Sequence, residues 1–558
     1  MKSGSTKILL IGLDAATFEL IKPWASQGLL PVFRDLMKRG TYGFLESTIP
    51  PQTPPAWTSA LTGKNPGKHN IFDFLKTGRG SYDLTPVNST DRKTSAIWNI
   101  LSRAGYKVGV FNVPMTFPPE DVNGFMLCGF LAPSVDCVYT SPGHLKKELL
   151  QNVKGYKASC SLGPLISGNE EAFLQDLYLY TEKQEEAALY LYDRYRPDFF
   201  MVGLFALDTL QHYFWRHMDK GHPLHDPEKS RKFGDAILKY YQRLDKLIKR
   251  LLEMVDEETV VSIISDHGAG PLHKELRANK YLESLGLLLR SKANYAGRIK
   301  AAALNKENMR RAVYRLKIGP FLARYFPEIV EAVKSWRPML SRSYMLADVD
   351  WSKTKAYLIS ETGIRINLKG RDPAGIVEWG NEYETLRDYI CRKLLDLRDP
   401  ETGQHLIEQV YRREEIYSGD YVENAPDLVV LAHPPYVAKQ KSRGELIGPP
   451  SVEGITRSGG HRPQGVFIMS GKNIKENNEL CGAQITDITP TLLYLLGEAI
   501  PEDMDGKVLM EAFDDRMRSM RDVNYRPAED DFREGDYQYT REEEEVVKKR
   551  LKGLGYID

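Results

Sequence analysis

Short apolar segments alternate with amphipathic helical segments along this chain, and this alternation restricts the fold more than any other feature. Apolar runs occur in KILLIGL at residues 7–13, DFFMVGLFAL at 198–207 and TVVSIIS at 259–265. Such runs predict strands that are buried on both faces. Helical patterns, for example at 233–255, separate them. We therefore predict an α/β fold in which a mostly parallel sheet is sandwiched between helices.

A large insertion interrupts this pattern. After residue 270 the alternation stops, and the segments KAYLIS, GIRINLKG and APDLVVLA indicate strands separated by turns. The core pattern resumes with the strand GVFIMSG and the helix TPTLLYLLG, for which Thr489 is the expected N-cap. The predicted organisation is a core at 1–270 and 455–514, an insertion or cap at 271–454, and a charged C-terminal tail at 515–558 with a short helix.

The insertion contains a basic segment of helical pattern at residues 290–342. Three interpretations stay open for it. It is a solvated helical surface, a cap that attracts anionic substrates, or a surface that meets anionic lipid or nucleic acid.

Composition excludes several classes of protein. A formal net charge of +1 over 558 residues gives no argument for a nucleic-acid binder, and we predict no stable nucleic-acid partner. The five cysteines include no C-x-x-C pair, which favours a reducing compartment, the cytoplasm. No apolar run is long enough to span a bilayer. The N-terminal apolar stretch is too brief for a signal peptide.

Acidic and histidine residues occur where the predicted strands end. Asp14 follows KILLIGL, and D-T-L-Q-H, from Asp208 to His212, follows DFFMVGLFAL. Asp266 and His267 follow TVVSIIS, and His461 ends a G-G-H loop before GVFIMSG. Each alone is equally a helix cap, a solvated pair or a turn. Because open α/β sheets bind ligands at the carboxyl ends of their strands, the three Asp and three His together predict two metal sites.

Thr53 is the candidate nucleophile. It lies in the segment PPQTPPAWTSALTG, whose proline-rich start is expected to break regular structure before a helix. A hydroxyl at the mouth of a helix could bind a metal, lose its proton and attack phosphorus. A role as a turn or cap residue is equally open from physics alone.

These segments, in this order, resemble the alkaline phosphatase superfamily, and most of all its type I phosphodiesterase/nucleotide pyrophosphatase branch. The resemblance rests on LIGLDA, T-P-P-A-W-T-S-A-L-T-G, D-T-L-Q-H, S-D-H-G and G-G-H, and it covers about 1–270 and 455–512. It implies an alkaline phosphatase-like fold and two divalent metal ions, with zinc expected and manganese as the alternative. It also implies a phosphothreonine intermediate on Thr53.

The resemblance also implies which residues bind each metal ion. Asp208, His212 and His461 would hold one ion, and Asp14, Asp266 and His267 would hold the other, with Thr53 also bound to the second.

The chain departs from the family near the nucleophile. Nucleotide pyrophosphatases carry an Asn three residues after the nucleophile, and here that place is Ala56, followed by Trp57. We therefore expect Ala56 and Trp57 to contribute to a substrate pocket unlike that of nucleotide pyrophosphatases. Another donor must therefore hold the phosphoryl oxygen. Several basic residues are candidate substrate-binding groups, although each is equally a surface residue: Lys64, Lys68, His69, Arg365, Arg371 and Arg462.

Three functions compete. The leading hypothesis is a phosphodiesterase, with a phosphomonoesterase as its close alternative, acting on a small phosphoester. The second is a cofactor-independent phosphomutase, which resembles this core. The third is a non-catalytic phosphate-binding protein, against which the retention of all six ligands and the hydroxyl argues. A sulfatase is disfavoured because that group needs Cys or Ser at position 53.

Overall fold

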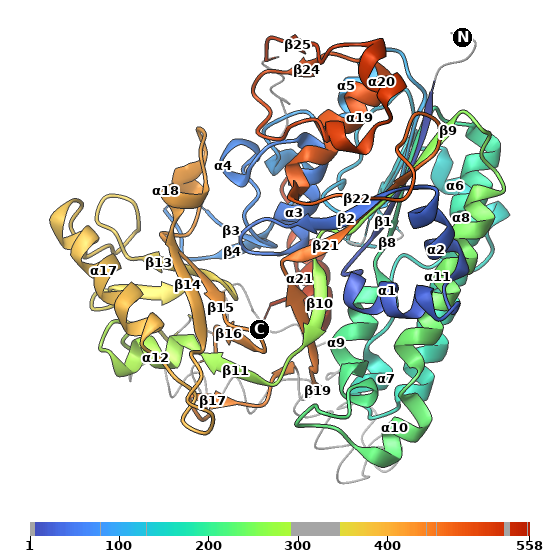
Figure 1. Cartoon of the computed structure of the whole chain (residues 1–558). Coiled ribbons are helices and arrows are strands. Elements are labelled where there is room, and N and C mark those ends of the chain that lie inside the picture. Colours follow the sequence, from blue (N-terminus) through green and yellow to red (C-terminus); the bar gives the residue numbers. More distant parts are fainter. Residues whose placement is uncertain are drawn as a thin grey trace, which may run out of the picture.

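A ten-stranded sheet forms the centre of the core, in the order β22-β2-β21-β9-β1-β8-β5-β6-β7, with β23 paired to β2 (Figure 1). The strands are β1 (Lys7–Leu13), β2 (Gly40–Glu46), β5 (Val108–Val113), β6 (Gly124–Cys128), β7 (Thr140–Ser141), β8 (Phe199–Leu204), β9 (Thr259–Ile264), β21 (Gln464–Ser470), β22 (Asn478–Glu479) and β23 (Ala483–Gln484). The computed structural model describes residues 6–78, 80–129, 131–134, 136–291, 346, 348–441, 444–452, 455–528, 536–554 and 556–557.

The middle of the sheet is parallel. β1 pairs in parallel with β8 on one side and β9 on the other, and β5 continues the parallel part beyond β8. β21 is antiparallel to both β9 and β2. The carboxyl ends of β1, β8 and β9 therefore meet at one edge, as predicted for a mostly parallel sheet.

Helices cover both faces of the sheet. Alternate side chains of β1 point to opposite faces, and each set is buried in its own apolar cluster. One face packs against α1 (Phe18–Ser26), α2 (Pro31–Lys38), α6 (Leu145–Asn152), α7 (Gly163–Ile166), α8 (Glu170–Tyr195), α9 (Ala206–Met218), α10 (Pro227–Phe233) and α11 (Ala236–Leu252). The other packs against α3 (Thr53–Thr62), α5 (Ile97–Arg103), α19 (Ile488–Leu496), α20 (Asp515–Met520) and α21 (Arg541–Leu554). This layering confirms the predicted α/β class.

The chain between β10 (Gly268–Pro271) and β20 (Gly459–Arg462) has its own apolar cluster and lies beside the core (Figure 1). One sheet has the order β12-β13-β15-β14 and another β16-β11-β17. The elements are β11 (Lys274–Arg277), α12 (Ala278–Ser284), β12 (Ala356–Leu358), β13 (Gly363–Ile366), α17 (Asn381–Leu395), β14 (Ile407–Arg412), α18 (Arg413–Ile416), η2 (Val422–Asn424), β15 (Leu428–Ala432), β16 (Tyr436–Lys439), β17 (Ile447–Gly448), β18 (Ser451–Val452) and β19 (Ile455–Thr456). The boundaries given above for core, insertion and tail stay predictions.

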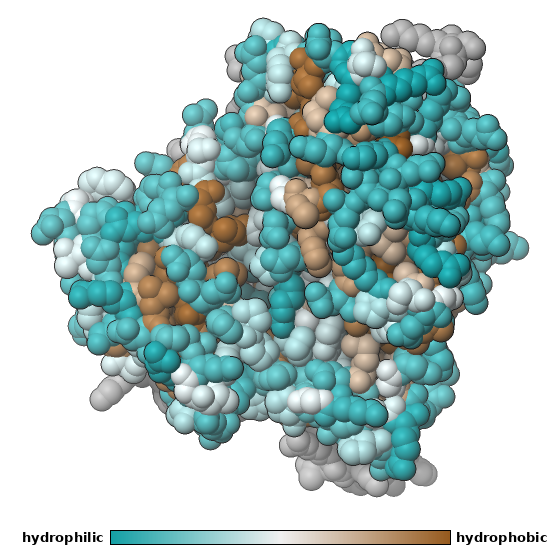
Figure 2. Space-filling view, in the orientation of Figure 1, coloured by the Kyte–Doolittle hydropathy of each residue, from teal (hydrophilic) through white to brown (hydrophobic). Residues whose placement is uncertain are grey.

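Short elements complete the core. They are α4 (Pro66–His69), β3 (Leu75–Thr77), β4 (Leu84–Pro86), η1 (Ser89–Asp91), η3 (Ile485–Asp487), β24 (Ile500–Pro501), η4 (Met510–Ala512) and β25 (Tyr525–Arg526). The face drawn in Figure 2 is largely hydrophilic, with hydrophobic residues in separate patches, one of them over the insertion at the left.

The start of one helix differs from the sequence-based expectation. The α19 helix begins at Ile488 with Asp487 as its N-cap, so the prediction of Thr489 as cap was wrong. The Thr489 hydroxyl instead donates to the carbonyl of Ala60 and ties α19 to α3.

Most of the basic segment 290–342 lies outside the described residues. Among the helices that the structure describes, none combines the length and apolar character that crossing a membrane requires.

Candidate metal and nucleophile site

The predicted metal ligands converge at the carboxyl edge of the parallel strands. Asp14 follows the last residue of β1, and Asp266 and His267 follow β9. Asp208 and His212 lie on α9, which begins directly after β8, and their i,i+4 spacing places both side chains on one helix face. Three neighbouring strands thus deliver five of the side chains to one point.

His461 reaches the same point on a strand. β20, which carries His461, pairs antiparallel with β10, and Ala269 lies opposite His461. The expected G-G-H loop was therefore wrong: Gly459 and Gly460 are extended and hydrogen-bonded to β10. Gly459 packs against the backbone of α9, where an added Cβ would lie 2.3 Å from the Gln211 carbonyl oxygen. Only a glycine allows β20 to approach α9 this closely.

Neighbouring side chains of the six lie close together. His212 Nε2 is 3.1 Å from Asp208 Oδ2, and His461 Nε2 is 3.2 Å from His212 Nε2 and 3.6 Å from Asp208 Oδ1. His267 Nε2 is 3.7 Å from Asp14 Oδ1 and 3.3 Å from Asp266 Oδ2. All are buried, apart from His461, which is partly buried.

Backbone carbonyls orient the three imidazoles. The Nδ1 atoms of His212, His267 and His461 lie 2.9, 3.1 and 3.0 Å from the carbonyl oxygens of Gly459, Gly268 and Pro51. A proton on Nδ1 satisfies each of these contacts, and it leaves Nε2 free of a proton and facing the cluster. Unprotonated Nε2 atoms are suited to binding a cation.

Burial and mutual repulsion set the charges of the cluster. Burial raises the pKa of Asp14 well above its usual range, and the Asp266 and Asp208 carboxylates raise it further. Burial and Asp208 likewise raise the pKa of Asp266. Burial opposes ionisation of Asp208 too, but the facing imidazoles of His212 and His461 lower its pKa overall. Burial lowers the pKa of His267 to about 4.

This donor set fits divalent cations. The ligand atoms of Asp208, His212 and His461 lie within 4.8 Å of one another, and so do those of Asp14, Asp208 and His267. Both carboxylate oxygens of Asp14 and one of Asp266 are buried without a hydrogen-bond partner among the described residues. Buried carboxylates with no partner are costly unless a cation neutralises them. Asp208 lies in both groups, although the resemblance placed it in one, and Asp266, which was predicted to bind the second ion, lies in neither group.

Thr53 lies at the N-terminus of α3, beside this cluster. Its hydroxyl is fully buried, 3.5 Å from His267 Nε2. Pro50 and Pro51 lie outside regular structure, as predicted, but the helix begins at Thr53 itself, earlier than predicted. Pro54 and Pro55 occupy its first turn, where no intrahelical N–H is needed. Gln52 is the N-cap, which leaves the Thr53 hydroxyl free of a capping role.

The residues that follow Thr53 are buried in the core. Ala56 and Trp57 are fully buried, and the Trp57 indole packs on Gly12 of β1. Lys64 pairs with Asp503 and donates to the Thr94 hydroxyl at 2.7 Å, and Lys68 pairs with Asp505 at 2.6 Å. These contacts anchor the end of α3 to the segment after β24.

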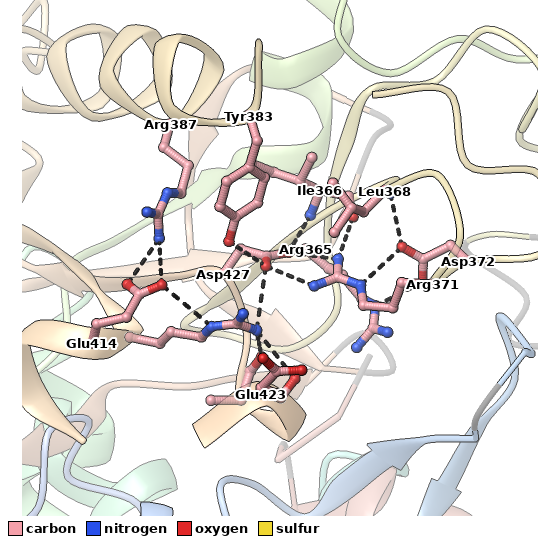
Figure 3. Close-up of polar contacts among 12 residues, drawn as sticks. Arg365, Ile366, Leu368, Arg371, Asp372, Tyr383, Arg387, Glu414, Glu423 and Asp427 are labelled. Carbon is pink, nitrogen blue, oxygen red and sulfur yellow. Dashed lines mark hydrogen bonds and ion pairs between the residues drawn. The ribbon is translucent and has the colours of Figure 1, made fainter. Parts of the chain in front are cut away.

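The other basic candidates also have protein partners. Arg365 donates to Asp372 at 3.0 Å, and Arg371 donates to both oxygens of Asp427 at 2.7 and 2.8 Å, within the insertion (Figure 3). Arg462 donates to the carbonyls of His461 and Pro271. His69 is buried and hydrogen-bonded to Ser59 at 2.9 Å. The structure brings none of these side chains into the group of six ligands and Thr53.

Two further side chains contact the cluster. Arg457 Nη2 lies 3.0 Å from His212 Nδ1 and 3.1 Å from His212 Nε2. Arg457 Nη1 donates to Glu361 Oε1 of the insertion at 3.3 Å. Tyr556, near the C-terminus, donates its hydroxyl to Asp208 Oδ2. The sequence analysis missed both. Arg457 stands four residues before His461, which was a usable signal, but no pattern in the tail points to Tyr556.

Comparison with solved structures shows the fold. The chain is similar to phosphonoacetate hydrolase from Sinorhizobium meliloti 1021, in complex with phosphonoformate or phosphonoacetate, with TM-scores of 0.52 and 0.51. Identity is 14%, and the match covers 88% of this chain and 95% of that chain. Human ectonucleotide pyrophosphatase/phosphodiesterase 5 matches with 14% identity and a TM-score of 0.49, over 91% of this chain and 98% of that chain. No curated protein sequence matches.

The family model for type I phosphodiesterase/nucleotide pyrophosphatase matches residues 8–461. This match includes the nucleophile candidate and all six ligand residues, and it ends at His461. The chain therefore belongs to the type I phosphodiesterase/nucleotide pyrophosphatase family of the alkaline phosphatase superfamily, and it is a metal-dependent hydrolase of phosphoric esters.

Proposed function

We propose that this enzyme is a two-metal phosphodiesterase that uses Thr53 as its nucleophile. One observation carries the proposal: the Thr53 hydroxyl, at the N-terminus of α3, faces the cluster of three carboxylates and three imidazoles at 3.5 Å from His267 Nε2. The α3 N-terminus favours a phosphoryl anion at this place. A buried hydroxyl with no capping role is available for attack.

Asp208, His212 and His461 would hold one ion, and Asp14, Asp266 and His267 the other, with Asp208 within reach of both. Zinc is the proposed metal and manganese the alternative, since imidazole and carboxylate ligands suit either ion. When bound, the ions supply the positive charge that lowers the pKa of the nucleophile and neutralises the phosphoryl group.

The protein residues direct two displacements. In the first, the Thr53 O–H bond breaks as Oγ1 bonds to phosphorus, the bond from phosphorus to the leaving oxygen breaks, and the proton passes to that oxygen to give the alcohol. In the second, water attacks phosphorus, the bond to Oγ1 breaks, and Thr53 regains a proton as the phosphomonoester leaves. The burial of the cluster excludes bulk water from the first step.

Hydrolysis of bis-4-nitrophenyl phosphate and of 4-nitrophenyl phosphate, by protein loaded with zinc or with manganese, tests the proposal. We expect a diester preference, with loss of about 10³-fold or more in kcat for Thr53→Ala. Thr53→Ser keeps a hydroxyl and is the matched control, expected within about tenfold of wild type. Acid-quenched protein should carry the phosphoryl adduct on the peptide that contains Thr53.

Other results would redirect the assignment. A monoester preference would favour the phosphatase or mutase alternative and call for a phosphoryl-transfer assay. Metal binding without hydrolysis of either ester would favour the phosphate-binding alternative. Full activity of Thr53→Ala would refute the nucleophile.

We also propose a cytoplasmic location. All five cysteines are free in the structure, which supports a reducing compartment.

A further inference from the structure

The C-terminal tail packs against the catalytic core. Val547 and Leu551 of α21 are fully buried in the same apolar cluster as α3 and α19. After the helix, the Tyr556 N–H donates to the Leu551 carbonyl at 3.0 Å, which turns the chain back toward the core. The Tyr556 ring stacks on Phe74, with centroids 4.4 Å apart, and its hydroxyl reaches Asp208. A segment beyond the family match thus forms one wall of the site.

A cavity of about 540 Å³ lies on the other side of Tyr556. It opens between the loop that leads into α7, the start of α9 and helix α21, all of which Figure 1 shows in the lower half of the core. Its walls are apolar at Leu162, Ile166, Phe205 and Leu554, and the basic side chains Lys157, Lys549 and Arg550 also line it. This volume is ample for a bicyclic aromatic ring or a short alkyl chain.

The cavity adjoins the side of the site formed by Asp208, His212 and His461, because the Tyr556 ring lies 6.1 Å from the His212 ring and 6.2 Å from the His461 ring. Phe205 and Thr209, which line it, flank Asp208 in the chain, and Tyr556 both lines it and contacts Asp208. Thr53 contacts His267 instead. In an in-line displacement the leaving oxygen departs opposite the attacking oxygen. The leaving group would therefore depart on the Asp208 side, toward Tyr556 and the cavity.

We propose that this cavity is the leaving-group subsite, that it takes an apolar alcohol or phenol, and that Tyr556 contacts the substrate at its entrance. The proposal rests on the phosphodiesterase function proposed above. It identifies the substrate class as phosphodiesters with an apolar leaving group. The apolar part of the wall provides favourable burial for such a group.

Two methyl phosphodiesters test this assignment, one releasing 4-nitrophenol and the other 4-methylumbelliferone. The two leaving groups have similar acidity but differ in ring size. We expect wild-type kcat/KM to favour the umbelliferyl ester, and we expect Ile166→Asp to lower this preference about tenfold. Ile166→Leu should retain it. Ile166 is 43% exposed at the end of α7, so its substitution is tolerated by the fold.

Leu179→Asp is the matched control, because Leu179 is 45% exposed on α8 and does not line the cavity. It should leave the preference unchanged. Fluorescence titration with free 4-methylumbelliferone measures the same subsite without turnover. We expect saturable binding that weakens about tenfold in Ile166→Asp and not in Leu179→Asp.

The outcomes separate the two proposals. The subsite would be refuted if Ile166→Asp hydrolysed both esters with the wild-type preference, or if Leu179→Asp lost the preference for the umbelliferyl ester equally. Either result would leave the phosphodiesterase function standing. In another outcome, the metal-loaded protein binds 4-methylumbelliferone in a way that depends on Ile166 but hydrolyses neither ester. This outcome would refute the phosphodiesterase proposal and the leaving-group assignment with it.

Discussion

Substitution of Gly12 by alanine is expected to disable the enzyme through the helix that carries Thr53. A Cβ at Gly12 would lie 2.5 Å from Trp57 Cη2 and 3.0 Å from Cζ3. Ordinary carbon contacts are about 3.5–4.0 Å, so the indole must retreat by about 1 Å. Gly12 itself cannot move easily, because β1 is hydrogen-bonded to β8 and β9 on both sides. Trp57 is one helical turn after Thr53, so α3 moves with it.

A displacement of about 1 Å at a reacting group costs roughly 10²-fold in rate. We therefore expect Gly12→Ala to lower kcat/KM for the 4-nitrophenyl diester by about 100-fold. Overpacking should also reduce the free energy of unfolding by about 1–3 kcal/mol. Steady-state kinetics and thermal unfolding of the zinc-loaded protein measure both quantities.

Two further variants isolate the cause. The clashing atoms belong to the six-membered ring of the indole, so Gly12→Ala with Trp57→Phe should recover most of the lost activity. Gly143→Ala is the control glycine, since an added Cβ there meets nothing within 4 Å, and it should behave as wild type. Activity of Gly12→Ala within threefold of wild type, or a double variant no better than the single one, would refute this reasoning.

Two more predictions concern buried carboxylates. Because the pKa of Asp14 is raised in the folded protein, the metal-free protein should lose stability as the pH rises above about 4, the pKa in the unfolded chain. Asp14→Asn should therefore melt at a higher temperature than wild type at pH 8 in chelator, and at a lower temperature with zinc. Thermal scans in which the order of the two proteins does not reverse would contradict the metal role. Asp427 is fully buried and accepts hydrogen bonds from Arg371 and Tyr383. Asp427→Asn should therefore lower the free energy of unfolding of the insertion by about 3–5 kcal/mol, measured by denaturant titration. Arg392→Ala, on the surface of α17, is the control and should not.

The core of this fold could be predicted from sequence because its strands are buried on both faces. KILLIGL corresponds residue for residue to β1, and TVVSIIS differs from β9 by one residue. Continuous apolar runs of this length are typical of strands that are covered on both faces. Since parallel strands end at one edge, the residues after them could be placed together as well. Asp14, Asp266 and His267 needed no further information.

Boundaries and long-range packing were less accessible. The helical period does not decide whether a helix starts at Asp487 or Thr489, because both are good caps. A G-G-H segment is typical of a turn, and only its pairing with β10 shows that it is a strand. Because β10 lies about 190 residues earlier in the chain, across the insertion, this pairing could not be predicted from the local sequence. The contact between Tyr556 and Asp208 joins positions 348 residues apart. No local pattern encodes a contact of that kind.

The insertion helps to build the metal site, and this follows from where it leaves and rejoins the core. β10 begins directly after His267 and leads into the insertion, and β20 returns from the insertion carrying His461, so each of the two connections lies at a predicted metal ligand. A register shift of one residue between β10 and β20 would turn the His461 side chain away from Asp208. Glu361 of the insertion accepts hydrogen bonds from Lys439 and Arg457, and Arg457 lies against His212. Packing of the insertion therefore holds two of the three imidazoles in place.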